Sequence, residues 1–420
     1  MDLKPTKPLS GFLELTPAAQ RFFDDTVRKM QEIAALAGFQ FIDLPAIERA
    51  EVLTDETDWE DTKTEMYLFQ KGDTKMGLRY DGTVGLARYT AGHLNDLDFP
   101  CRLTQCSKRW RGERAQKGRY REFYQMDFDI LGQGGLSDNY DAEVVALLSK
   151  IYNALPEVFG DYEINIGSRR FWNDFAKDNG IDSDTALKLF AIIDKKEKMP
   201  AAEFNAGLKE IAGDAAAKKV VSILDGGDAP GELRGFMDLL AAAGVSKARA
   251  NLATMRGLGY YDGIVYEAKS LTYPEIGSIG AGGRYGNLVG KFTKTQIIGS
   301  GAAIGITRAI VSAIESGRID LSKYESAVDA VILPMGQAQI PAALKAADEL
   351  RAAGIITTAF LDADKKFKNQ IEYADKIKAR FAVIIGEDEA RLGKVALKNM
   401  ASGEQAVVSV EEASGIIRKK

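Results

Sequence analysis

Residues 101–132 constrain the fold most strongly, because they predict two strands joined by one charged loop. The first strand runs through Arg102-Leu-Thr-Gln. The second runs from Glu122 to Gly132, where side chains alternate in character as they do along a strand. The loop from Arg111 to Arg121 therefore lies at one end of a strand pair.

Arginine dominates residues 109–121, and its guanidinium group suits bidentate phosphate contacts and stacking on planar bases. Arg111 and Glu113 lie at the end of the first strand, and the aromatic Phe123 lies on the second. Such a pair of strands can hold a nucleotide between them. The alternative is a solvated basic loop with no ligand.

Glycines cluster at 277–286 and again at 299–305, where Arg308 follows. Glycine allows the backbone to approach a ligand closely, although tight turns explain a single cluster equally well. A P-loop motif is absent, and the spacing does not fit a dinucleotide-binding fingerprint. Together with the separated arginines, the clusters predict an antiparallel nucleotide-binding sheet and not a doubly wound one.

The remaining sequence predicts further domains, as expected for a chain of 420 residues. Residues 17–36 have the apolar spacing of an amphipathic helix. Residues 172–250 are helical in period and predict an insertion, interrupted at 225–231. After a polar connector at 314–325, strands and helices alternate. This alternation predicts a small α/β domain with a partly parallel sheet.

Two counts exclude much catalytic chemistry. The chain contains two cysteines and one histidine, so a Cys/His zinc site of the usual spacing cannot form. His93 follows a segment that reads as the end of a helix, and we interpret it as a surface or capping residue. Net charge is −5, so any contact with nucleic acid must come from local basic patches. No apolar run predicts a membrane span or a signal peptide, and we expect a cytoplasmic protein.

Several motifs resemble one family. Residues 111–125 look like motif 2 of class II aminoacyl-tRNA synthetases in its histidyl form, and the strand ending at Pro45 resembles motif 1. Residues 256–267 and 279–288 resemble the two histidine-specific motifs of histidyl-tRNA synthetases, and residues 301–308 resemble motif 3.

The resemblance implies an α+β fold: a class II antiparallel sheet with flanking helices, a helical insertion and a C-terminal α/β anticodon-binding domain. The expected catalytic domain spans residues 1–322, with the insertion at about 172–250. The expected anticodon-binding domain spans residues 326–420.

The resemblance also implies a ligase reaction. Histidine reacts with ATP to give histidyl-adenylate, and the histidyl group then passes to the 3′ end of tRNA(His). Mg²⁺ accompanies the outer phosphates of ATP, and no protein metal ligand is expected. Pairing through motif 1 implies a homodimer. No membrane or DNA partner is expected.

Residue by residue, the resemblance implies the following roles around ATP. Arg111 holds the α-phosphate and the substrate carboxylate, and Arg256 neutralises charge developing at the α-phosphate. Arg308 meets the γ-phosphate. Phe123 stacks on adenine, and Glu113 fixes the adenine edge.

A histidine pocket needs a hydrogen-bond acceptor and a donor, because neutral imidazole offers one N–H and one bare nitrogen. Asp129 is the candidate acceptor and Tyr261 the candidate donor, with a paired strand acid and core packing as the respective alternatives. The histidine-binding residues implied by the resemblance are Asp81, Thr83, Gln125, Asp129, Arg256, Tyr260 and Tyr261. The first three hold the ammonium group, and one of the two tyrosines is expected to be core.

Two loop residues and three departures from the family pattern bear on tRNA contact and on the strength of the site. Arg114 and Gln116 either touch the tRNA acceptor end or are solvated. Gly259 stands where the family usually has Asp, Thr307 replaces an acid and Ala302 replaces an aromatic residue. Losing the acid is expected to loosen Arg308, and losing Asp to loosen Arg256 or the tyrosines.

The sequence is also compatible with two other functions. One is a non-catalytic paralogue, such as a regulatory subunit of ATP phosphoribosyltransferase, which usually lacks the C-terminal domain. The other is a synthetase-like ligase with a different acceptor. The intact arginines and the C-terminal segment favour the working synthetase.

Overall fold

The computed structural model describes residues 4–54, 64–226, 230–255 and 259–419. The described residues belong to two compact units. The first comprises residues up to 14 together with 24–319, and the second comprises 15–23 together with 320–420. Each unit has its own sheet and is described separately.

An eight-stranded sheet forms the centre of the first unit, in the order β1-β5-β6-β11-β10-β9-β7-β8. Its inner strands pair antiparallel, whereas the edge strands β1 and β8 pair parallel to their neighbours. The strands are β1 (Gln40–Phe41), β5 (Cys101–Trp110), β6 (Glu122–Gln133), β7 (Tyr162–Ser168), β8 (Ala248–Ala250), β9 (Ile264–Ser270), β10 (Ser278–Tyr285) and β11 (Ile297–Gly305). The predicted antiparallel sheet is thus confirmed.

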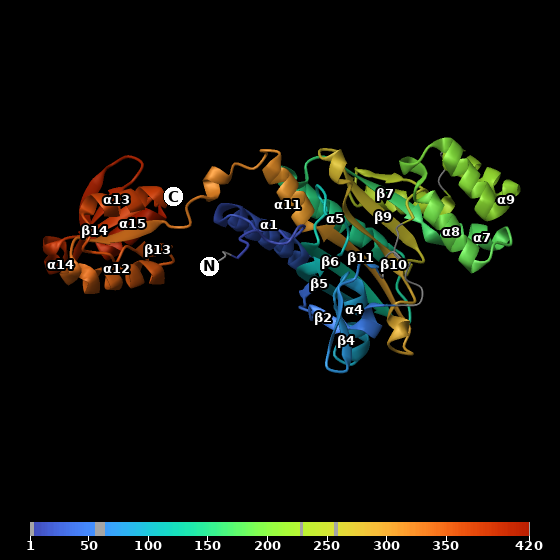
Figure 1. The fold of residues 1–420 in the computed structure, drawn as a ribbon, viewed down its shortest axis with the longest axis horizontal. Coiled ribbons are helices and arrows are strands. Elements are labelled where there is room, and N and C mark those ends of the chain that lie inside the picture. The colour runs from blue at the N-terminus through green and yellow to red at the C-terminus, as the bar shows by residue number, and fades with distance from the viewer. Residues whose placement is uncertain (1–3, 55–63, 227–229, 256–258, 420) are drawn as a thin grey trace. The chain divides into compact units, whose positions relative to one another are not determined.

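Strand β6 shows why this sequence forms a two-sided sheet. Met126, Phe128 and Ile130 are completely buried among apolar neighbours, while Gln125 and Asp127 alternate with them and line a cavity. Helices α5 (Asn139–Ala154) and α11 (Ile306–Glu315) pack against β11 and β6, with the short α6 (Pro156–Phe159) beside α11 (Figure 1). One side of the sheet therefore supplies the core and the other can supply a site.

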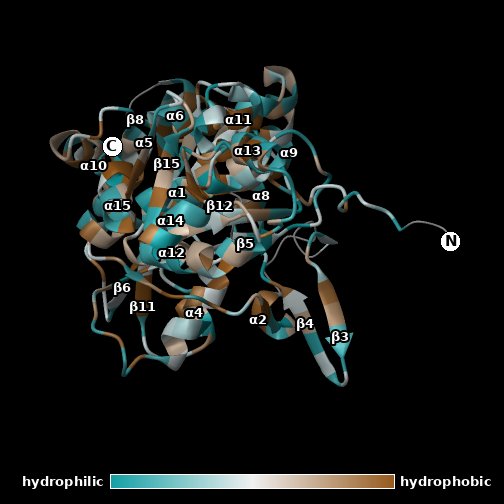
Figure 2. Cartoon of the chain, turned by 90° about the vertical axis from the view of Figure 1, so that its left-hand side faces the viewer, coloured by the Kyte–Doolittle hydropathy of each residue, from teal (hydrophilic) through white to brown (hydrophobic). Residues whose placement is uncertain are grey.

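A small second sheet in the same unit was not predicted from the sequence. It has the order β2-β4-β3, from β2 (Ile47–Arg49), β3 (Leu68–Lys71) and β4 (Thr74–Leu78). Figure 2 shows the β3–β4 hairpin standing out from the rest of this unit. Helix α2 (Ala50–Leu53) packs against β4, and α4 (Thr83–Gly92) begins shortly after β4 ends. Helix α1 (Pro17–Leu36) has the bounds that its apolar spacing predicts.

The segment expected as an insertion is helical. Its helices are α7 (Arg169–Asp178), α8 (Ser183–Ile193), η1 (Lys196–Lys198), α9 (Ala201–Gly226) and α10 (Gly231–Ala242). Figure 1 shows α7, α8 and α9 beyond β7 and β9, whereas α10 contacts α5, β7 and β8. Helix α9 kinks at Gly213, where φ is 79° and glycine avoids the strain of a side chain. The segment ends in β8, which extends the main sheet beside β7, a pairing the sequence did not reveal. No helix in the described ranges is long and apolar enough to cross a membrane.

The second unit contains a five-stranded sheet in the order β13-β12-β14-β15-β16. Its elements are η4 (Leu321–Tyr324), β12 (Ala330–Pro334), η5 (Gln337–Gln339), α12 (Ile340–Ala352), β13 (Thr357–Ala359), α13 (Phe367–Lys376), β14 (Phe381–Ile385), α14 (Glu387–Leu392), β15 (Lys394–Asn399), β16 (Gln405–Ser409) and α15 (Val410–Arg418). Strand β12 pairs parallel with β13 and β14, and β15 and β16 pair antiparallel. The predicted partly parallel sheet is present. Strands β15 and β16 extend it, and α15 packs against these two strands.

Candidate active site

A cavity of about 410 Å³ lies against the main sheet of the first unit. Residues from the turn before α4, the loop after β5, and strands β6 and β9 to β11 contribute to its wall. Nine residues predicted from the sequence line it: Asp81, Thr83, Arg111, Glu113, Phe123, Gln125, Tyr260, Tyr261 and Arg308. Sheet pairing therefore brings together side chains that lie more than two hundred positions apart in sequence.

Arg111 is held between two aromatic rings in the cavity wall. Its guanidinium carbon lies 4.6 Å from the ring centre of Tyr80 and 5.3 Å from that of Phe123. Its Nε also donates to the Tyr80 carbonyl oxygen at 3.3 Å. Cations are attracted to ring faces at such distances, so the two rings restrict the position of the charge. Tyr80 was not predicted as a site residue.

Arg308, in the first turn of α11, fastens the loop 111–121 to the sheet. Its Nε donates to the Gly118 carbonyl oxygen at 2.6 Å, and its Nη1 donates to that of Ser278 at 2.5 Å. Within the loop, Arg119 forms an ion pair with Glu113 at 3.0 Å. The loop is thus held against the cavity, and Arg119 within it is paired.

The turn before α4 presents a carboxylate to the cavity. Asp81 accepts a hydrogen bond from the Val84 N–H at 3.1 Å, and the Tyr260 hydroxyl donates to its other oxygen at 3.3 Å. Burial raises the pKa of Asp81 above its ordinary value. A ligand ammonium group would compensate for this cost, because an opposite charge stabilises the ionised carboxylate.

Both tyrosines of the first histidine motif line the cavity, and both also pack against the buried cluster that includes Tyr285. The expectation that one of them is core stays a prediction. Their ring centres are 4.7 Å apart, and Tyr260 also packs edge-on to Tyr285. Both residues belong to the segment just before β9.

Asp129 is not among the residues that line the cavity. It is buried one alternation beyond Asp127 on β6, and the Tyr285 hydroxyl donates to its Oδ1 at 2.9 Å. Burial and the nearby Asp127 raise the pKa of Asp129 well above its ordinary value. Gly301 makes room for it, since a Cβ there would lie 1.8 Å from that oxygen. The predicted contact between Asp129 and imidazole stays a prediction.

Three other predicted residues are not seen at the cavity. Arg256 lies outside the described residues. Arg114 and Gln116 are exposed on the loop, where the backbones of Gln116 and Arg119 bond to each other in a tight turn. Neither exposed residue lines the cavity, and a role at the tRNA acceptor end stays a prediction.

The structure shows the surroundings of the three positions that depart from the family pattern. The buried Thr307 hydroxyl accepts from the Tyr124 N–H at 2.8 Å and so joins α11 to β6. The neighbouring Arg308 is held by two carbonyl oxygens in place of an acid. Ala302 is buried in β11 opposite Phe128, and Gly259 is exposed.

Several residues in the wall escaped sequence reasoning. The insertion contributes Asp194 and Lys198, whose charged groups lie 3.4 Å apart. Strand β9 contributes Glu267 and Lys269, and Lys269 pairs with Glu197 of the insertion at 2.5 Å. In the sequence, the charged residues of the insertion look like an ordinary solvent-exposed helix face. For Glu267 and Lys269, the only available signal was the alternation of side chains along β9.

Comparisons with known proteins agree along the whole chain. The family model described as histidyl-tRNA synthetase matches residues 11–309, and the one described as anticodon binding domain matches residues 329–420. The histidine–tRNA ligase of Clostridium tetani is 35% identical over 444 aligned positions, which cover 99% of each chain.

Solved structures show the same relationship. The histidyl-tRNA synthetase from Nostoc sp. PCC 7120 superimposes with a TM-score of 0.81 at 29% identity, covering 100% of both chains. A Bacillus halodurans C protein described as an ATP phosphoribosyltransferase regulatory subunit/histidyl-tRNA synthetase shares the fold, with a TM-score of 0.68, 18% identity and 91% and 99% coverage. From the family match and the full-length relative, the chain belongs to the histidyl-tRNA synthetase family.

Proposed function

We propose that this chain activates histidine with ATP and transfers the histidyl group to the 3′ end of tRNA(His). The observation that carries the proposal is the single cavity that gathers cationic, aromatic and acidic side chains from the expected motifs. Attack by the histidine carboxylate on the α-phosphorus needs alignment and charge neutralisation, and no protein nucleophile.

The nucleotide would lie along the arginine side of the cavity. Arg111 would contact the α-phosphate and the substrate carboxylate, and its two flanking rings would keep its charge in place. Arg308 would meet the γ-phosphate from α11, and Phe123 and Glu113 would hold adenine. The resemblance assigns Arg256 to the α-phosphate. These contacts would neutralise the pyrophosphate as it leaves.

The amino acid would lie on the acidic side. Asp81 would bind the substrate ammonium group with Thr83 and Gln125, because its carboxylate is already buried in the wall. Tyr261 would donate to the imidazole ring, and Asp129 would accept from it. A donor on one ring nitrogen and an acceptor on the other would discriminate against analogues that lack these groups.

Mg²⁺ would enter with the triphosphate and shield its charge. Oxygen ligands suit this ion, and the triphosphate itself would supply them, in keeping with the expectation of no protein ligand. Glu267 adds a carboxylate to the cavity wall, so the charges present fit a cation bound by the phosphates. The chain's own contribution is to position the phosphates with its arginines.

Homodimer formation in the cytoplasm belongs to the same proposal. Apolar side chains on β1, β2 and β3 are partly exposed: Phe41, Ile47, Leu68 and Phe69. Burying them against a second copy would lower the free energy through the hydrophobic effect. Light scattering after size-exclusion chromatography should give twice the chain mass of 45.8 kDa.

Residues 1–322 would form the catalytic domain, and residues 326–420 would bind the anticodon. The regulatory-subunit alternative is not favoured, because the full-length relatives are named as ligases. Removing residues 326–420 should abolish tRNA charging while adenylate formation survives.

Exchange of ATP with pyrophosphate, measured with each amino acid in turn, tests the proposal. We expect exchange with histidine alone, and a loss of about a hundred- to a thousand-fold in Arg111→Ala and in Arg308→Ala. Arg391→Ala, an exposed arginine of the second unit, is the matched control and should exchange normally. Absence of exchange in a folded wild-type protein would refute the proposal.

A further inference from the structure

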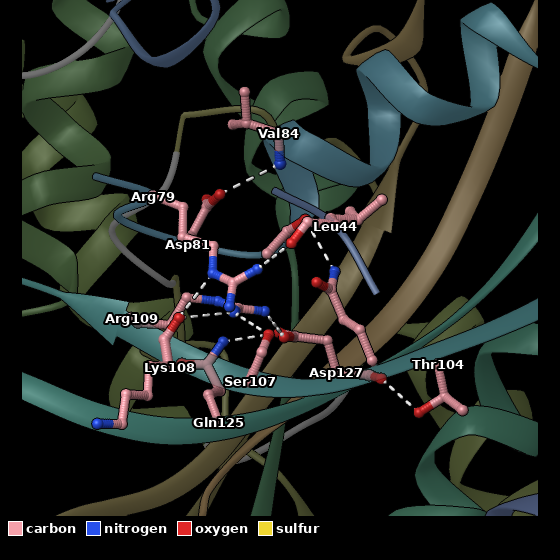
Figure 3. A network of polar contacts seen from close by, with 12 residues as sticks. Leu44, Arg79, Asp81, Val84, Thr104, Ser107, Lys108, Arg109, Gln125 and Asp127 are labelled. Atoms are coloured by element: carbon pink, nitrogen blue, oxygen red, sulfur yellow. Dashed lines mark hydrogen bonds and ion pairs between the residues drawn. The ribbon is translucent and has the colours of Figure 1, made fainter. Parts of the chain in front are cut away.

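A buried ion pair lies beneath the acidic side of the cavity (Figure 3). The Nη2 of Arg109 lies 2.5 Å from Oδ2 of Asp127, and the two side chains are 0% and 3% exposed. Arg109 also donates to the Ser107 hydroxyl at 2.6 Å and to the Lys108 carbonyl oxygen at 3.0 Å. The pair is therefore fixed from several directions.

Asp127 also holds the side chain of Gln125. The Gln125 Nε2 donates to Oδ1 of Asp127 at 2.6 Å, and both residues line the cavity. In its ion pair with Arg109, Asp127 presents acceptor oxygens, so the amide turns its NH₂ group toward Asp127. The carbonyl oxygen of Gln125 is then the end left for a ligand. An ammonium group, which only donates, requires such an acceptor.

The same pair supports the turn that carries Asp81 and Thr83. A Cβ on Gly82 would lie 2.4 Å from Nη2 of Arg109 and 2.5 Å from Oδ2 of Asp127. The turn therefore rests directly on the pair, and glycine permits this approach. The Gly82 carbonyl oxygen is held in addition by Gln105, whose Nε2 donates at 3.0 Å.

We propose that Asp127 is a positioning residue that makes the amide of Gln125 an acceptor for the substrate ammonium group. Asp127 thereby selects α-amino acids over analogues that lack the amino group. The inference rests on the proposed function, because it concerns the same amino-acid pocket. Neither residue reacts with the substrate, and Asp127 acts through Gln125.

The variant Asp127→Asn tests this polarity. Its oxygen would accept from Arg109, and its NH₂ group would face Gln125, whose amide must then turn over. The cavity would present an NH₂ group to the substrate ammonium. We expect the KM for histidine in pyrophosphate exchange to rise at least about tenfold, the cost of one lost charge-assisted hydrogen bond. The KM for ATP should stay unchanged.

A ligand without the amino group separates polarity from general damage. Imidazolepropionate is histidine without its ammonium group, and it should inhibit wild type and Asp127→Asn with the same inhibition constant. If that constant rises by the same factor as the KM for histidine, or if the KM for ATP rises equally, Asp127 has only a structural role.

A double-mutant cycle tests whether Asp127 acts through Gln125. Gln125→Leu removes the acceptor but leaves the Arg109–Asp127 pair intact, and it should raise the KM for histidine by a similar factor. In the double variant the two effects should not add. Additive effects would overturn the proposal.

Two further variants keep the test decisive. Arg109→Gln/Asp127→Asn removes both charges, so no unpaired charge stays buried if Asp127→Asn alone does not fold. Asp141→Asn is the matched control, since Asp141 is buried against Arg284 and does not line the cavity. It should lower thermal stability without a selective rise in the KM for histidine. Wild-type exchange with histidine, measured first, shows separately whether the proposed function holds.

Discussion

Two buried arginine–aspartate pairs in the first unit use the same chemistry in different surroundings. Arg109 meets Asp127 at 2.5 Å, and Arg284 meets Asp141 at 3.0 Å, with all four side chains at most 5% exposed. Arg284 also pairs with the exposed Asp138 and donates to the Leu136 carbonyl oxygen, and Asp141 does not line the cavity. Asp127 instead lines the cavity.

The difference shows what makes a buried ion pair useful for binding. Both pairs join a strand to a neighbouring element, and loss of the arginine leaves a buried carboxylate without its ion-pair partner. Of the two pairs, only Arg109–Asp127 is hydrogen-bonded to a side chain that lines the cavity: Asp127 accepts from Gln125. A buried ion pair can therefore influence ligand binding when one of its carboxylate oxygens accepts a hydrogen bond from a residue that lines the site.

Removing one arginine from each pair should have the largest effect on stability. Arg109→Ala and Arg284→Ala each leave a buried carboxylate uncompensated, and we expect the free energy of unfolding to fall by about 3–5 kcal/mol. Urea denaturation followed by circular dichroism measures this. The exposed Arg391→Ala provides the baseline. An unchanged midpoint for Arg109→Ala would show that the pair contributes no stability.

Two glycines near the start of α4 should give opposite results. A Cβ on Gly82 would collide with the Arg109–Asp127 pair, so Gly82→Ala should destabilise by about 1–3 kcal/mol. Gly85 lies inside α4, where the nearest atom to a Cβ would be Leu44 Cδ1 at 3.5 Å. Gly85→Ala should therefore stabilise the protein by up to about 1 kcal/mol. Equal effects in thermal melts would contradict the close packing beneath Gly82.

Asp129 is a buried carboxyl group with a tyrosine partner in place of an arginine, and its effect should be the smallest. Because its pKa is raised in the folded protein, the folded chain holds a proton that the unfolded chain has released. Stability therefore falls as pH rises from the ordinary carboxyl range through the raised pKa. Asp129→Asn keeps an acceptor for Tyr285 but cannot ionise.

We expect this variant to melt a few degrees higher than wild type at pH 8, and at the same temperature near pH 4. Calorimetry at both pH values measures the difference. A constant difference at the two pH values would mean that the effect does not come from ionisation.

Local sequence patterns predicted much of the fold. The helix at 17–36 and the strands on either side of the charged loop follow from periodicity, because each segment has one apolar face. The β2–β4–β3 sheet and the addition of β8 beside β7 could not be predicted in this way. Those short strands are defined by partners distant in sequence, and they lack a periodic pattern of their own.

The candidate site was predictable where a motif carried it. Arg111 lies in the segment that resembles motif 2 and Arg308 in the one that resembles motif 3, and both line the cavity. Asp127 lies within one of those strands, but its importance depends on Arg109 and Gly82, which only the folded chain brings together. Contacts of this kind depend on the register between β5 and β6, and sequence spacing does not reveal them.

The chain contains one histidine, so its imidazole adds little background to an NMR spectrum of bound histidine. His93 lies at the end of α4, 46% exposed, with Nδ1 3.0 Å from Asp96, and it does not line the cavity. In a nitrogen–proton correlation spectrum tuned to imidazole rings, each protein chain contributes a single residue. Isotope-labelled histidine bound in the cavity would therefore be observed against an almost empty background. The tautomer chosen by the pocket could be read directly from the substrate.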